Sequence, residues 1–121
     1  MDLNKEQVCE YDEKGWIILP QLFSKEEVSI LESAAMDVLQ RPGPEVAREL
    51  NGDPHVCWGM HLFDERFSAL TRHPSLLLPV EQLMRNQVFV HQSRINIKQQ
   101  NGCKRIYMAR YCKAYGIFGS R

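Results

Sequence analysis

Hydrophobic residues in the first half of the chain recur at the spacing of helices. Two helix starts have a polar residue followed three positions later by Gln or Glu, at Asn4-x-x-Gln7 and Ser24-x-x-Glu27, which is the pattern of a capping box. Gly15 is placed to end the first helix, and Arg41-Pro42 to end the second. Asp64 and Pro74 are placed to start two more. The pattern therefore predicts four helices.

The other apolar segments are typical of strands. Residues 16–19 form a short β-favouring run before Pro20, and residues 42–62 have loop character with one short helical turn at 44–50. Residues 88–98 have the length and β-branched content of a strand and contain no Gly or Pro. Side chains alternate between faces in a strand, so two faces are expected here. The odd face is mostly apolar and would pack under helices, whereas the even face carries Gln92, Arg94, Asn96 and Lys98.

The polar face of this predicted strand has two interpretations. In the simpler one it is the wet side of an antiparallel sheet whose other side packs on the core. In the other, the strand lines a polar pocket in which amide and cationic groups bind a carboxylate ligand. The planar fork of an arginine matches a carboxylate, so Arg94 is the residue on which this second interpretation depends.

Composition limits the chain to a single domain and excludes several functions. It has 121 residues, 15 basic and 15 acidic, and 44% are hydrophobic. No apolar run approaches the roughly 20 residues of a membrane span. The N-terminus lacks the pattern of a signal peptide, which predicts a cytoplasmic protein with no membrane association. Four cysteines without a C-x-x-C pair argue against a zinc knuckle or a dense disulfide framework.

Charge is distributed unevenly along the chain. Residues 1–100 hold all the acidic residues and have a balance of −5, whereas residues 101–121 have five basic residues, no acid and two of the cysteines. The division at residue 100 separates a main portion from a divergent basic tail. Tyrosines interleaved with the basic residues would allow stacking on single-stranded nucleic acid, but five charges are a modest footprint, so we do not expect nucleic-acid binding.

Five stretches in a fixed order resemble the phytanoyl-CoA dioxygenase superfamily, and the His-Gln-Ser-Arg-Ile-Asn stretch at 91–96 is most similar to ectoine hydroxylase. The resemblance covers roughly residues 4–99. It rests on Tyr11-x-x-x-Gly15-Trp16-Ile17, Leu22-Phe23-Ser24-x-x-Glu27-Val28, Gly59-Met60-His61-Leu62, Arg72-His73-Pro74 and the segment 88–98.

The resemblance implies an α+β fold, in which N-terminal helices pack on the first strands of a double-stranded β-helix of the jelly-roll type. It also implies Fe(II) on a two-His, one-carboxylate triad, with 2-oxoglutarate as cosubstrate and a small polar molecule as substrate. By similarity, Asn96 would contact 2-oxoglutarate, and Gln92 and Arg94 would face the substrate or support its pocket.

The chain departs from the family pattern after Gln100. No Trp-His-x-Asp follows, and none of the four histidines (55, 61, 73 and 91) has Asp or Glu two positions later. Structural or surface roles are therefore expected for all four, with His73 at a helix start and His91 on the packing face of the strand. No metal ligand is assigned, and we expect this chain to bind neither Fe(II) nor 2-oxoglutarate and to turn over no 2-oxoglutarate.

Two hypotheses of different classes follow. A jelly roll needs about eight strands, and only two are predicted before residue 100, so we expect an incomplete barrel. In the leading hypothesis the chain is a truncated or frame-shifted product of a dioxygenase, inactive alone. In the other it is a small non-catalytic α+β interaction module that pairs, or self-associates, through an exposed strand edge.

Overall fold

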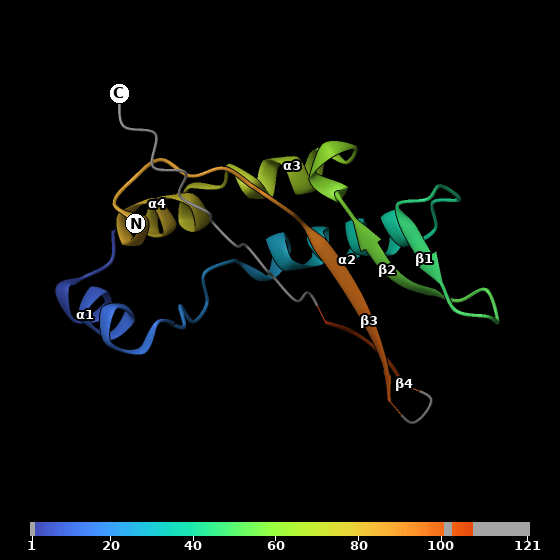
Figure 1. Ribbon diagram of the computed structural model, residues 1–121, viewed down its shortest axis with the longest axis horizontal. Coiled ribbons are helices and arrows are strands. Elements are labelled where there is room, and N and C mark those ends of the chain that lie inside the picture. Colours follow the sequence, from blue (N-terminus) through green and yellow to red (C-terminus); the bar gives the residue numbers. More distant parts are fainter. Residues whose placement is uncertain (1, 101–102, 108–121) are drawn as a thin grey trace.

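A computed structural model describes the backbone of residues 2–100 and 103–107, and the side chains of residues 2–97. Four helices and a four-stranded antiparallel sheet form an α+β fold, as the sequence predicted (Figure 1). No helix of this part is long and apolar enough to cross a membrane. In chain order the elements are α1 (Lys5–Lys14), α2 (Lys25–Leu39), β1 (Val46–Arg48), β2 (Pro54–Trp58), the 3-10 helix η1 (Met60–Leu62), α3 (Glu65–Thr71), α4 (Pro74–Met84), β3 (Arg94–Gln100) and β4 (Cys103–Tyr107).

The helix starts are set by local side-chain bonds, which is why the sequence predicted them. Asn4 and Ser24 each accept a bond from the backbone N–H three residues on, and Gln7 and Glu27 bond back, so both capping boxes are complete. Asp64 caps α3, and Pro74 occupies the first turn of α4. Gly15 ends α1 in the left-handed conformation, at φ 76°, where a Cβ would be strained.

The strands differ from the prediction in three places. Residues 16–19 are not a strand, and Ile18 is 71% exposed. The expected loop at 42–62 instead contains the β1–β2 hairpin and η1. The strand expected over 88–98 begins only at Arg94, because its neighbour β2 ends at Trp58, which lies opposite Arg94.

The sheet has the order β1-β2-β3-β4, with each strand antiparallel to the next. Cys57 lies opposite both Val46 of β1 and Ile95 of β3, which places these three residues on one face. β4 pairs with β3 across the predicted boundary at residue 100. The other expectations for the basic tail concern residues 101–102 and 108–121, and the side chains of 103–107, which lie outside the described residues.

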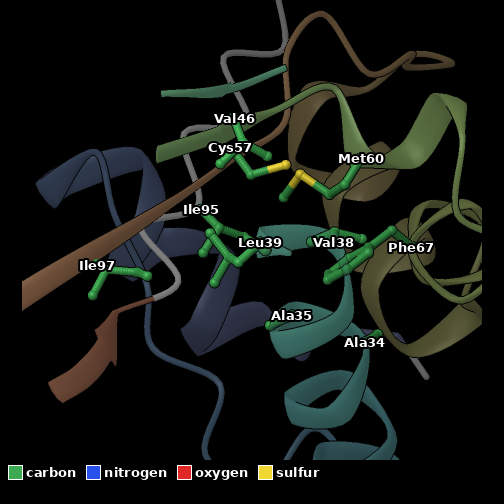
Figure 2. Packing of buried hydrophobic residues seen from close by; sticks show 10 residues of the cluster. All are labelled: Ala34, Ala35, Val38, Leu39, Val46, Cys57, Met60, Phe67, Ile95 and Ile97. Atoms are coloured by element: carbon green, nitrogen blue, oxygen red, sulfur yellow. The ribbon is translucent and has the colours of Figure 1, made fainter. Parts of the chain in front are cut away.

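The core lies between that face and α2 (Figure 2). Leu39, Ile95 and Cys57 are the largest fully buried side chains, and burial raises the pKa of the Cys57 thiol to about 11. Figure 2 shows the side chains of the sheet and of α2 pointing toward one another, with Phe67 of α3 closing one side. The cluster consists of Ala34, Ala35, Val38, Leu39, Val46, Cys57, Met60, Phe67, Ile95 and Ile97.

Helix α1 lies with α4 at the opposite end of the molecule from the β1–β2 hairpin (Figure 1). It buries no residue of its own. Gln82 of α4 holds the preceding segment by accepting a bond from the Leu3 N–H at 2.7 Å and donating to the Leu3 carbonyl at 2.9 Å. Arg85 donates to Asp12 at 3.0 Å. Side-chain bonds, rather than an apolar face, therefore attach α1.

Leu39→Ala should lower the free energy of unfolding by about 2–5 kcal/mol, because it opens a cavity where the side chain is 1% exposed. Leu62→Ala is the matched control, since Leu62 is 80% exposed and its loss should change the free energy by less than about 0.5 kcal/mol. Urea denaturation followed by circular dichroism measures both. Equal effects in the two variants would contradict the packing described.

Glu27 should make stability depend on acid pH. Its carboxylate accepts bonds from the Ser24 N–H and from His73 Nε2, and these bonds lower the pKa of the carboxyl below its ordinary 4.5. A lowered pKa adds stability above the ordinary value, and this stability is lost as the pH falls through and below it. Glu27→Gln should thus reduce the loss of stability between about pH 6 and pH 3. Glu26→Gln, at an exposed neighbour, should keep the wild-type profile; a wild-type profile in Glu27→Gln would refute the assignment.

Candidate functional site

The candidate site is the face of the sheet that points away from α2. Trp58 lies opposite Arg94, and Val56 opposite Asn96, so these four residues share the face that alternates with Cys57 and Ile95. Ala47 extends it onto β1, opposite Val56. Val56 is 6% exposed although it is not part of the main cluster, and Arg94 and Asn96 are half-buried. This face is therefore a mixed surface of aromatic, aliphatic and polar groups.

The sequence placed Arg94 and Asn96 on one strand face, and the structure does so as well. Gln92 lies two residues before β3, is exposed and is not in a strand. The predicted strand face therefore holds two of the three candidate residues, and Gln92 borders it. The roles given to the three residues, contact with 2-oxoglutarate for Asn96 and with the substrate for Gln92 and Arg94, stay predictions.

Residues just before β3 are fixed by the turn that follows β2. Gly59 takes a left-handed conformation, at φ 68°, and its N–H donates to the Ser93 carbonyl at 2.9 Å. In the next residues, His61 Nδ1 of η1 and Ser93 Oγ are hydrogen-bonded at 2.5 Å. Ser93 is thus held by both its main chain and its side chain. This double attachment sets the point at which Arg94 enters the sheet.

The histidines are dispersed over the described part of the chain. His55 pairs with Glu49 at 2.9 Å in the hairpin, and His73 with Glu27 at 3.0 Å, so the structural role expected for His73 at a helix start is confirmed. The position predicted for His91 on the packing face is wrong, because the residue is exposed and precedes the strand. Residues 2–100 and 103–107 bring together no group of three His, Cys, Asp or Glu side chains that would hold a metal ion.

The tautomer of His73 follows from its two bonds. Nδ1 accepts from the Ser75 N–H at 3.3 Å, so a neutral ring carries its proton on Nε2 and donates it to Glu27. The ring also meets Phe23 edge-on, with the centroids 5.3 Å apart. This histidine joins the starts of α2 and α4 and lies on the helical layer of the molecule, so we assign it no part in the candidate site.

Sequence reasoning missed Trp58 and the hairpin that carries it. A signal was present, because Asn51-Gly52 is a preferred hairpin turn and a β-favouring Val-Cys-Trp run follows it. The turn is closed by a bond from the Glu49 N–H to the Asp53 carbonyl, at 2.8 Å, and Gly52 adopts φ 85°. β1 has three residues, which is too short for an alternation of apolar and polar residues to predict a strand.

Ser93→Ala should lower the free energy of unfolding by about 0.5–1.5 kcal/mol, because it removes the hydroxyl that His61 bonds. It should also speed exchange of the Gly59 amide proton, whose acceptor is the Ser93 carbonyl. Ser29→Ala, at an exposed position of α2, is the control. Hydrogen exchange followed by NMR distinguishes them, and an unchanged Gly59 rate in Ser93→Ala would show that the side-chain bond does not hold this turn.

Comparisons with known proteins identify relatives of the described part. L-proline trans-4-hydroxylase of Streptomyces griseoviridis is 33% identical over 90 residues, which are 74% of this chain and 34% of that protein. Ectoine dioxygenase of Bordetella bronchiseptica is 30% identical over 101 residues, which are 79% of this chain and 33% of that protein. The chain thus spans about a third of the length of these curated relatives. No family model matches the sequence.

Solved structures agree with these relatives. EctD from S. alaskensis, crystallised with 2-oxoglutarate and 5-hydroxyectoine, superimposes with a TM-score of 0.72 at 25% identity, over 79% of this chain and 36% of that one. The same protein with bound Fe gives a TM-score of 0.74 over the same shares. The N-terminal part of this chain is therefore homologous to the ectoine and proline hydroxylases of the phytanoyl-CoA dioxygenase superfamily, as the sequence predicted.

Proposed function

We propose that the face formed by Arg94 and Asn96 is one wall of a small-molecule site of the Fe(II)/2-oxoglutarate dioxygenase type. The observation that carries this proposal is the state of Arg94. The residue is half-buried on the face away from the core, and within the described residues its guanidinium has no hydrogen bond or ion pair. A partly desolvated arginine without a counter-ion is suited to bind the carboxylate of a ligand.

The other arginines with described side chains differ from Arg94, because each of them has a protein partner. Their bonds join helices, turns and caps of the fold, so none of their guanidinium groups is comparably available to a ligand. Arg41 binds Glu45 at 2.6 Å, Arg48 donates to the carbonyl oxygens of Leu39, Arg41 and Gly52, Arg66 binds Asp37 and Asp64, Arg72 reaches Ser68 at 3.4 Å, and Arg85 binds Asp12.

Asn96 adds directional polar groups to the same face. Its side-chain amide can donate and accept hydrogen bonds. It lies two residues after Arg94 on β3, on the same face of the sheet. On the basis of homology, Asn96 would bind 2-oxoglutarate, and Arg94, with Gln92 at the border, would bind the substrate. EctD of S. alaskensis has been crystallised with 2-oxoglutarate and 5-hydroxyectoine, and with bound Fe. For this chain, a small polar substrate follows by analogy.

Iron does not fit the residues that the structure describes. No group of three suitable side chains gathers in this part, and no histidine follows His91 anywhere in the 121 residues. We infer that this chain supplies a ligand-binding wall and part of the barrel, and that it is inactive alone as a hydroxylase. The wall binds and orients a carboxylate through Arg94 and Asn96, and no oxidation step is assigned to its residues.

In contrast to the expectation from the sequence, the proposed function requires the 121-residue chain to bind 2-oxoglutarate weakly at this face, without turning it over. In an NMR titration, the amide signals of residues 94–96 should shift. Arg94→Gln should weaken binding by about ten- to a hundredfold, because the unpaired guanidinium assigned to the substrate can also bind a carboxylate of 2-oxoglutarate when no substrate is present, and this charge-assisted bond is lost. Arg72→Gln, at an exposed arginine at the C-terminal end of α3, should bind like the wild type. Shifts that do not depend on Arg94 would refute this assignment.

Turnover is tested separately, with iron, 2-oxoglutarate and oxygen added to the purified chain. We expect no succinate, because an iron-binding set is absent from the described residues. Succinate formed in proportion to the chain, and abolished by a chelator, would contradict the proposal. Homology alone does not predict this result, since the relatives are named as hydroxylases.

A second candidate function is a non-catalytic interaction module. It is favoured by the sheet, which in the described part ends in β1 on one side and β4 on the other, and each of these strands pairs with only one neighbour there. An edge strand with free backbone groups can pair with another chain. A discrete, cooperatively melting dimer in size-exclusion chromatography with light scattering would favour this function, whereas a monomer that binds 2-oxoglutarate would favour the first.

A further inference from the structure

Trp58 lies on the candidate face directly opposite Arg94, at a position where side chains of neighbouring strands approach closely. The Gly59 N–H bonds the Ser93 carbonyl, so residues 59 and 93 are a hydrogen-bonded pair of the β2–β3 ladder. Such pairs alternate with non-hydrogen-bonded ones along an antiparallel ladder, so Trp58 and Arg94 form a pair of the second kind. The Trp58 N–H agrees with this, since it bonds the Glu45 carbonyl on the β1 side at 2.9 Å.

Side chains of a non-hydrogen-bonded pair are the nearest neighbours on a sheet face, with Cβ atoms about 4.5–5.5 Å apart. Trp58 and Arg94 nonetheless do not stack. Among the described side chains, the cation–π contacts are Lys14 over Trp16 and Arg41 over Phe63. Both the indole face of Trp58, which is 36% exposed, and the guanidinium of Arg94 are therefore available to a third group.

Burial shows that Trp58 is not a core residue. It is absent from the cluster between the sheet and α2, and it points to the opposite face from its neighbour Cys57. Val56, on the same face, is only 6% exposed, so a buried apolar side chain lies two residues from the indole along β2. A large aromatic ring beside an unpaired cation, on such a surface, has the composition of a small-molecule site.

We propose that Trp58 determines substrate specificity: its ring packs on the nonpolar body of a small carboxylate whose charged group binds Arg94. This inference rests on the proposed function and adds the chemical class of the substrate. The ligand has one carboxylate and, within a few ångströms of it, a compact hydrocarbon body. A polar dicarboxylate such as 2-oxoglutarate has no such body, so its binding should not depend on Trp58.

Three probes test the two parts of this recognition separately: cyclopentanecarboxylate carries both the body and the charge, acetate only the charge, and cyclopentylmethanol only the body. Each is titrated into the full 121-residue chain, and the amide signals of residues 56–58 and 94–96 are followed by NMR. Cyclopentanecarboxylate should bind at least about tenfold more tightly than either of the other probes, because only it engages both groups.

Two variants of Trp58 test whether the tighter binding of cyclopentanecarboxylate depends on the indole ring. Trp58→Ala should reduce the affinity for cyclopentanecarboxylate to that for acetate, whereas Trp58→Phe should retain it within about threefold, because an aromatic face remains. Trp16→Phe is the matched control, since Trp16 is exposed on the segment that follows α1. Dispersion of the amide signals shows whether Trp58→Ala is folded, and Trp58→Phe provides the test if it is not.

The results separate this inference from the proposed function. Equal affinities for cyclopentanecarboxylate and acetate, no binding of either, or wild-type affinity in Trp58→Ala would each overturn the role of Trp58. If 2-oxoglutarate still binds in an Arg94-dependent manner, the proposed function survives that failure. If no carboxylate depends on Arg94, both fail together. If Trp58→Ala loses the preference for cyclopentanecarboxylate over acetate and still binds 2-oxoglutarate like the wild type, the result supports both the role of Trp58 and the proposed function.

Discussion

The packing of one sheet face on α2 is the constraint from which the rest of this structure follows. Ile95 and Cys57 face each other across β3 and β2 and are fully buried against Leu39. Because side chains alternate along a strand, a slip of one residue would turn Arg94 and Asn96 into the core and Ile95 out of it. Burial of two polar groups, one of them charged, without partners would be costly. The apolar core thus determines which residues face a ligand.

Different interactions stabilise different parts of the molecule. The centre is held by apolar burial, whereas the N-terminal helix is attached by side-chain bonds of Gln82 and Arg85 and the start of β3 by His61 and Ser93. Single hydrogen bonds of this kind contribute about 1 kcal/mol each. The segments that border the candidate face are therefore less firmly fixed than the face itself, which lies on paired strands.

The stretch on which the resemblance rests leads into the strand of the candidate face. The relatives are named as ectoine and proline hydroxylases, and the 91–96 stretch that carried the resemblance ends on the strand that bears Arg94 and Asn96. The described residues contain no group of three His, Cys, Asp or Glu side chains that would hold a metal ion, so the function proposed for this part is to bind a ligand without oxidising it. The role proposed for Trp58 adds a chemical class of substrate that the names of the relatives do not give.

The sequence by itself determined the helices and their ends, because capping boxes such as Ser24-x-x-Glu27 are satisfied within a few residues. It also determined that Ile95 and Arg94 lie on opposite faces, since alternation is a local property of a strand. Only the tertiary structure decided where strands begin. Residues 16–19 and 88–92 favour β-structure but do not form strands, and the weakly patterned β1 is a strand because it pairs with β2. Pairing between distant segments likewise placed Trp58 beside Arg94, which no local pattern encodes.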